Sequence, residues 1–159
     1  MLLGPALVIL PKNIKATYHY VDVMVEKFRF LEHTADDKFE AFGDSKEELF
    51  TNCSLAMTAV MTSDVVTKKI SHTIEIKANR IESLLFDFLN ELLFVLESEK
   101  LILADIKEIK IDDNKLIATI IGDNVNNYDI EAGIKAVTYN DMIVVEKNNK
   151  WRAIVVVDL

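Results

Sequence analysis

Residues 38–61 read KFEAFGDSKEELFTNCSLAMTAVM, and within this stretch the spacing of the apolar side chains changes. Apolar or small residues occupy alternate positions from Phe39 to Gly43, which is typical of a strand with one buried face. Ser45 is followed three residues later by Glu48, a capping box that predicts the start of a helix. Apolar residues then recur at helical spacing as far as Met61, so the helix should end near residues 62–64. The stretch therefore predicts a strand that passes directly into a helix.

The flanking sequence extends this pattern in both directions. A short strand is expected around Phe28, a strand with one wet face over 68–78, and a long helix from residue 80 to 100 with Asn79 as its cap. Further strands are expected over 101–112, 115–122, 135–147 and 151–159, the last two joined by a hairpin turn at Asn148-Asn149. This order lacks strict βαβ alternation. It predicts an α+β fold with two helices packed on one face of a mixed, largely antiparallel sheet.

Composition limits the classes of protein that fit. The chain has 159 residues, enough for one domain with a sizeable core, and 50% of them are hydrophobic. The net charge of −8 argues against direct nucleic-acid binding, because holding phosphates requires a basic footprint. An acidic protein can instead dock on a basic partner. No segment reaches the roughly 20 apolar residues of a membrane span. The single cysteine, Cys53, fits a reducing cytoplasm.

The N-terminal residues form a separate case. MLLGPALVIL is apolar but short, it contains Pro5, and it lacks both the basic start and the clear cleavage site of a signal peptide. Residues 1–23 are therefore interpreted as an extension, either an edge strand or a loosely attached tail. An alternative is that the natural chain begins at Met24. In both cases residues 24–159 are expected to form the single domain.

Known catalytic motifs are absent from the sequence. It has no glycine-rich phosphate loop, no zinc-ligand spacing and no nucleophile elbow. Cys53 lies in the apolar stripe of the first expected helix, where a small buried hydrophobe is expected rather than a nucleophile. Glu131, Lys135 and Tyr139 could form an acid–base set, but such residues are common on loops and strands. We therefore predict no catalytic residue and no independent enzyme.

Several short motifs, in a fixed order, resemble one family. They are LEHTAD at 31–36, the capped helix after GDS, FLNELL at 88–93, KAVTY at 135–139 and the terminal WRAIVVVDL. Together, from about Phe28 to Leu159, they resemble the archease family. The chain departs from the family pattern at Asp37-Lys38, where an apolar residue and glycine are usual. It also has Asn140 in place of histidine and Leu159 in place of isoleucine.

The resemblance implies a helper protein. Archease activates the tRNA-splicing RNA ligase, which joins a 2′,3′-cyclic phosphate or 3′-phosphate end to a 5′-hydroxyl end, by promoting guanylylation of the ligase histidine and multiple turnover. By motif position, a divalent cation, most often Ca²⁺ with Mg²⁺ as the alternative, would be held by Asp36, Asp158 and the terminal carboxylate of Leu159. Lys135 and Tyr139 would contact the ligase or its guanine nucleotide. A role as chaperone or specificity modulator of a tRNA methyltransferase is the alternative.

The chemistry of the acidic ends agrees with this ligand set. If the last strand lies beside the strand that follows residues 33–36, then Asp36, Asp158 and the terminal carboxylate meet at one sheet end. Three carboxylates about 5 Å apart repel by roughly 1–3 kcal/mol per pair, so the cluster would bind a cation or take up protons. Ligands that are all oxygen favour Ca²⁺ or Mg²⁺ over zinc. Two solvated strand ends are the simpler interpretation, and Asp37 is expected to face solvent.

Overall fold

The computed structural model describes residues 6–7, 17–20, 23–31 and 37–159, and for residues before Glu26 it describes the backbone only. The described helices are α1 (Lys46–Met61) and α2 (Ile81–Glu99), with a short 3-10 helix η1 (Val125–Asn127). The strands are β1 (Ala6–Leu7), β2 (Thr17–Tyr20), β3 (Val23–Glu26), β4 (Phe28–Leu31), β5 (Asp37–Gly43), β6 (Ile70–Lys77), β7 (Leu101–Asp112), β8 (Lys115–Asn124), β9 (Ala136–Lys147) and β10 (Lys150–Asp158).

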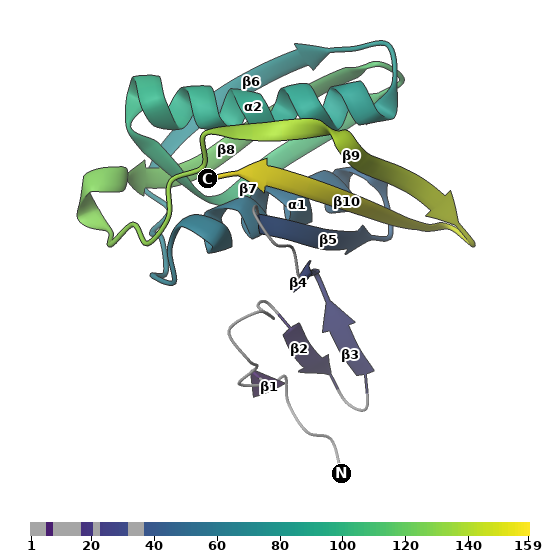
Figure 1. Cartoon of the computed structure of the whole chain (residues 1–159), viewed down its shortest axis with the longest axis horizontal. Helices are drawn as coiled ribbons and strands as arrows, with labels where there is room; N and C mark the ends of the chain where they lie inside the picture. Colours follow the sequence, from purple (N-terminus) through teal and green to yellow (C-terminus); the bar gives the residue numbers. More distant parts are fainter. Residues whose placement is uncertain (1–5, 8–16, 21–22, 32–36) are drawn as a thin grey trace.

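The strands are distributed over three sheets, with the orders β4-β5-β10-β9, β6-β8-β7 and β1-β2-β3. Every pairing among the described residues is antiparallel. The expected α+β class is confirmed, but the single mixed sheet of the prediction is divided. The division arises because β6 pairs with β8, so the chain leaves the first sheet through α1 and builds a second one. Figure 1 shows α1 behind β5 and β10, with α2 beside β9.

Both helices bury the faces that the sequence indicated. Ser45 caps α1 as expected, since its Oγ accepts a hydrogen bond from the backbone N–H of Glu48 at 3.1 Å. The predicted cap of α2 is wrong: Arg80, not Asn79, occupies the N-cap position, and it makes no side-chain cap bond. Since helix α2 buries six apolar side chains, its stability comes from packing rather than from a cap. Phe50 of α1 stacks on Phe88 of α2, with ring centroids 5.9 Å apart.

The hairpin between β9 and β10 fixes the direction of the last strand. Asn148 and Asn149 have φ values of 54° and 61°, the left-handed conformation that a two-residue hairpin turn requires and that asparagine tolerates well. The predicted turn is therefore confirmed. From this turn β10 runs back between β9 and β5, so the C-terminal strand is central in its sheet.

The N-terminal strands pair with one another rather than with either larger sheet. In Figure 1, β1, β2 and β3 project from the body of the molecule next to β4. Strand β3 spans Val23–Glu26 and so crosses the boundary expected at residue 24. The division into an extension over 1–23 and a domain over 24–159 stays a prediction.

Candidate functional site

One end of the four-stranded sheet gathers the C-terminus and two segments that are distant in the sequence. Val157 of β10 lies opposite Asp37 at the start of β5, and Asp158 lies opposite Ala136 at the start of β9. The backbone N–H of Lys135 donates to the carbonyl of Asp158 at 2.8 Å. The last two residues, the strand that begins directly after Asp36, and Lys135 therefore meet at one sheet end, which we call the carboxyl-terminal end.

The predicted cation ligands are only partly covered by the described residues. Asp158 and Leu159 are exposed at the carboxyl-terminal end. Asp36 lies outside the described residues. Among the residues that the structure describes, no group of three acidic, histidine or cysteine side chains is arranged to hold a metal ion. The ligand set of Asp36, Asp158 and Leu159 therefore stays a prediction. Its donors are all carboxylate oxygens, which suit a hard divalent cation.

The position of Lys135 is fixed by the connection between β8 and β9, residues 125–135, which includes η1. Thr62 donates to the carbonyl of Asp129 at 2.7 Å, and the N–H of Asp129 donates to the Asp64 carboxylate at 2.9 Å. The N–H of Glu131 donates to the carbonyl of Met61 at 2.8 Å. These bonds tie the connection to the C-terminal end of α1. Lys135 thus reaches Asp158 from a segment held at several points, and its side chain is exposed.

Tyr139 is oriented differently. Its hydroxyl accepts a hydrogen bond from Arg80 at 2.8 Å and lies 3.2 Å from the Ser83 hydroxyl. Its ring meets Phe86 edge to face at 5.3 Å. Tyr139 lies three residues beyond Ala136 on β9, about 10 Å along the strand from the carboxyl-terminal end. A partner-binding role for Tyr139 stays a prediction, but its described contacts connect β9 to α2.

The structure does not assemble the acid–base set considered for Glu131, Lys135 and Tyr139. The Glu131 carboxylate accepts hydrogen bonds from the backbone and side chain of Ser63, whereas the Tyr139 hydroxyl bonds to Arg80. Cys53 is completely buried, and burial raises the pKa of its thiol far above the ordinary value. Such a thiol stays protonated and is a poor nucleophile. The prediction that none of these residues is catalytic stays a prediction.

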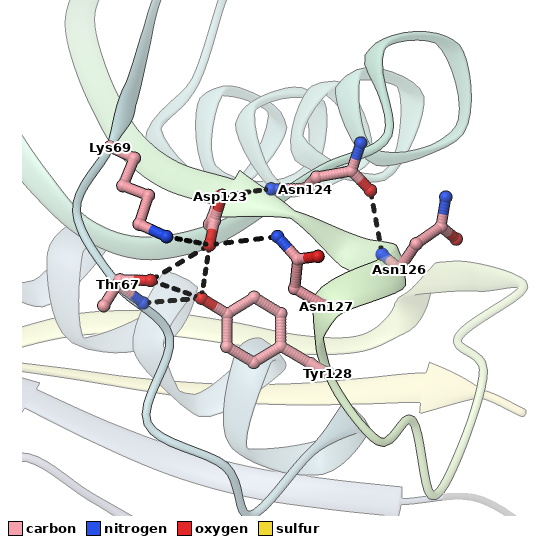
Figure 2. Close-up of polar contacts among 7 residues, drawn as sticks. All are labelled: Thr67, Lys69, Asp123, Asn124, Asn126, Asn127 and Tyr128. Atoms are coloured by element: carbon pink, nitrogen blue, oxygen red, sulfur yellow. Dashed lines mark hydrogen bonds and ion pairs between the residues drawn. The ribbon is translucent and has the colours of Figure 1, made fainter.

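The sequence did not reveal a polar cluster around Asp123, shown in Figure 2. Asp123 is buried at the end of β8, and its Oδ2 accepts hydrogen bonds from Tyr128 at 2.7 Å and Thr67 at 3.0 Å. Its Oδ1 accepts from the N–H of Asn124 at 2.8 Å, and the Lys69 ammonium lies 3.6 Å from Oδ2. The bonds from Tyr128 and Asn124 hold the pKa of Asp123 well below its ordinary range.

The Asp123 cluster anchors the start of the 125–135 connection. Tyr128 belongs to this connection, and its hydroxyl also accepts a hydrogen bond from the backbone N–H of Thr67 at 2.9 Å. Asp123 therefore joins the segment before β6 to the segment that leads to Lys135. No periodic pattern marks such a residue, because its partners are 5 and 56 positions away in the chain. Its only signal in the sequence is an Asp-Asn pair at the end of an apolar strand.

The fold and the carboxyl-terminal end define a class of small α+β protein in which the last strand is central in its sheet and ends beside Asp37 and Lys135. Within the part of the chain that the structure describes, no helix is both long and apolar enough to cross a membrane. Residues 28–159 match the model of the archease protein family (MTH1598/TM1083). The chain belongs to this family.

Individual relatives agree with this assignment. A protein archease from Methanosarcina barkeri is 35% identical over 144 residues, which cover 84% of this chain and 97% of that protein. The solution structure of Methanobacterium thermoautotrophicum protein 1598 is 34% identical, with a TM-score of 0.72, and covers 84% of this chain and 99% of that one. A crystal structure titled an archease, possible chaperone, from Thermotoga maritima has a TM-score of 0.59 over 81% of this chain and 94% of that one. It is 23% identical and supports the fold alone.

Proposed function

We propose that this protein is a non-catalytic activator of the tRNA-splicing RNA ligase. It would promote guanylylation of the ligase histidine and so allow multiple turnover in the joining of 2′,3′-cyclic phosphate or 3′-phosphate ends to 5′-hydroxyl ends. Membership of the archease family supports the proposal. The observation that carries it is the register of β10 against β5, with Val157 opposite Asp37. This register places the chain terminus beside the strand that follows the HTAD motif.

A divalent cation at the carboxyl-terminal end would supply positive charge there. Asp36, Asp158 and the carboxylate of Leu159 would hold it, and Ca²⁺ is the ion that this oxygen set favours, with Mg²⁺ as the alternative. The ion could present charge to the ligase while its histidine is guanylylated, or it could pin the C-terminus so that a rigid docking surface results. We favour the first role, because a structural clip would not need the final residue of the chain.

At the carboxyl-terminal end, Lys135 is the basic residue best placed to contact the ligase or its guanine nucleotide. Its backbone is bonded to Asp158 at 2.8 Å, while its side chain is exposed. An ammonium group there could contact a phosphate of the ligase-bound guanine nucleotide, since phosphates are recognised by lysine as a point charge. The overall charge of −8 fits a partner that is itself basic and holds the RNA, so we expect no direct nucleic-acid binding and a cytoplasmic location.

The test is a guanylylation assay with the RNA ligase of the same host. Purified ligase is incubated with GTP, and ligase–GMP is followed with and without substoichiometric amounts of this protein. We expect faster ligase–GMP formation and more than one ligation per ligase molecule. Asp158→Asn should lose the stimulation, whereas Asp113→Asn in the exposed β7–β8 turn should retain it. Absence of any acceleration by the unaltered protein would contradict the activator role.

Assays with the same purified protein distinguish the activator role from two other functions. If the protein modulates a tRNA methyltransferase instead, it will leave ligase–GMP formation unchanged and alter the yield or position of methylation by that enzyme. A metal-dependent phosphate hydrolase would turn over nucleotides without any partner. Incubation of the protein alone with a nucleotide panel and Ca²⁺, Mg²⁺ or Mn²⁺ is expected to give no product.

A further inference from the structure

The four-stranded sheet has one face that no described helix covers. Phe39, Ala41 and Val155 point to the other face, where they are fully buried and α1 packs against β5 and β10. Because side chains alternate along a strand, their neighbours lie on the opposite side. Figure 1 shows α1 behind this sheet and no described helix in front of it. We call this side the outer face. Its basic residues are Arg29, Lys38, Lys147, Lys150 and Arg152.

A buried carboxylate organises the centre of the outer face. Glu40 is only 5% exposed and accepts hydrogen bonds from Arg29 Nε at 3.0 Å, from Arg29 Nη2 at 2.8 Å and from Arg152 Nη1 at 3.0 Å. Burial raises the pKa of Glu40, but the two arginines outweigh it and hold that pKa below the ordinary value. The side chains of Arg29 and Arg152 are 46% and 43% exposed. Each guanidinium has five donors, so both retain N–H groups beyond those that bind Glu40.

Aliphatic side chains lie beside these arginines. Val145 is directly opposite Arg152 in the pairing of β9 with β10, and it is 40% exposed. Ile143 lies one rung further along the same face and is 41% exposed. Arginine is enriched at protein interfaces, and the centre of an interface is more apolar than the rest of the protein surface.

The outer face is positive on an acidic protein. Five basic side chains are set against three acidic ones, Glu40, Asp44 and Asp158, which leaves +2 before the terminal carboxylate is counted, whereas the whole chain carries −8. Lys38 and Lys147 have no ion pair with another described residue within 4.0 Å. The charge that this face offers a ligand is therefore opposite to that of the molecule as a whole.

We propose that the outer face binds an acidic, partly aliphatic segment of a partner protein. Carboxylates of the segment would meet the free donors of Arg29 and Arg152, and its aliphatic side chains would cover Ile143 and Val145. A second copy of this chain is disfavoured, because two such faces would place positive charge against positive charge. The chain's own residues 1–21 contain no aspartate or glutamate, so they lack the complementary charge.

Nucleic acid is a poorer match for the outer face. Single-stranded RNA is usually held by aromatic side chains that stack on bases, together with a basic groove. The aromatic residue of this face is Phe42, and the Arg29 guanidinium already lies 5.7 Å from its ring centroid. Burial of exposed aliphatic groups such as Val145 is more favourable under apolar protein side chains than under polar nucleotides.

The test uses the full chain and three probes of about ten residues: a peptide alternating glutamate with isoleucine and valine, its lysine counterpart, and single-stranded RNA. Fluorescence anisotropy gives the affinities, and amide chemical shifts locate the binding. We expect only the acidic peptide to bind, with shifts in β5, β9 and β10. Lys38→Glu with Lys147→Glu should weaken this binding about tenfold. The matched double variant Lys107→Glu with Lys110→Glu, exposed on β7, should change it by less than about twofold.

A second variant tests the aliphatic part without changing charge. Ile143→Thr with Val145→Thr keeps β-branched side chains on exposed strand positions, so the fold should persist, and the affinity for the acidic peptide should fall. Melting curves of all variants verify folding. The proposal is overturned if the acidic peptide fails to bind or if both lysine double variants weaken it equally. It is also overturned if RNA binds with the same dependence on Lys38 and Lys147. No ligase is present, so these outcomes are independent of the proposed activator function.

Discussion

Val157, the third residue from the C-terminus, lies directly opposite Asp37 across the antiparallel pair of β10 and β5. The two residues are 120 positions apart in the sequence, and their pairing is what brings the end of the chain to the strand after HTAD. Strand β10 is central in its sheet, so its end is held on both sides, by β5 and by β9. A terminus held in this way can present a carboxylate at a defined place, which a frayed terminus cannot.

The first prediction concerns cation binding at this end. Ca²⁺ should bind the full chain and raise its Tm, because a ligand that binds only the folded state stabilises it. Asp158→Asn should abolish most of this Ca²⁺-dependent shift, since it removes one anionic ligand with little change of shape. Calorimetric titration and melting curves in Ca²⁺ and in chelator provide the measurement. Asp113→Asn is the control, and an equal loss in both variants would contradict a site at the carboxyl-terminal end.

The second prediction concerns the terminal carboxylate itself. One glycine added after Leu159 moves this group by up to about 3.5 Å, which is more than a coordination bond tolerates. The extended protein should melt like the unaltered one in chelator but bind Ca²⁺ more weakly and stimulate ligase–GMP formation less. Amidation of the native C-terminus, which removes the charge without lengthening the chain, should have the same effect. Unchanged Ca²⁺ affinity in both forms would exclude Leu159 as a ligand.

The sequence predicted those features that local chemistry determines. The capping box at Ser45 and the Asn148-Asn149 turn were confirmed because each depends only on residues that are close together in the sequence. The cap of α2 was wrong because burial of the α2 side chains, not a cap bond, decides where that helix begins. The division into separate sheets was missed, since strand periodicity does not say which strand β6 will choose as its partner.

The candidate site shows the same limit. Family resemblance indicated Asp158 and Leu159, and the register of β10 agrees with their expected surroundings. Asp123 was not found, because its importance depends on Thr67 and Tyr128 reaching it in three dimensions. The alternation from Phe39 to Gly43 puts Glu40 opposite the buried face of its strand, and nothing in its position shows that two arginines will bury it. Long-range polar contacts of this kind leave no periodic signal in a single sequence.

The third prediction follows from the lowered pKa of Asp123. A carboxyl group whose folded pKa lies below its unfolded value, about 3.9, stabilises the protein above that value and loses this contribution as the pH falls toward the folded pKa. Asp123→Asn should therefore lower stability at pH 7 and make the stability less dependent on pH below about pH 5. Urea unfolding at several pH values measures both effects. Asp113→Asn should leave the slope close to that of the unaltered protein.

A related variant separates the hydrogen bond from the charge. Tyr128→Phe removes the hydroxyl that donates to Asp123 at 2.7 Å while keeping the ring, and it should cost about 1 kcal/mol at pH 7. Because the 125–135 connection then loses one of its anchors, hydrogen exchange of the Lys135 amide should also become faster. An unchanged exchange rate would show that the hydrogen bonds of Asp129 with Thr62 and Asp64 hold the connection without the Asp123 cluster.

The fourth prediction concerns the close approach of β7 and β8 beside Asp123. Gly122 lies opposite Leu103 where a bulge interrupts β7, and a Cβ built on Gly122 would lie 1.9 Å from the carbonyl oxygen of Ile102. This contact is with backbone, so Gly122→Ala must push the two strands apart. Crowding of this kind typically costs about 1–3 kcal/mol, and it should also displace Asp123 and reduce the protection of the Lys135 amide. Gly133→Ala is the matched control, because a Cβ there meets no atom within 4 Å and stability should change by less than about 0.5 kcal/mol. Equal unfolding free energies for the two variants would show that the β7–β8 contact adapts without strain.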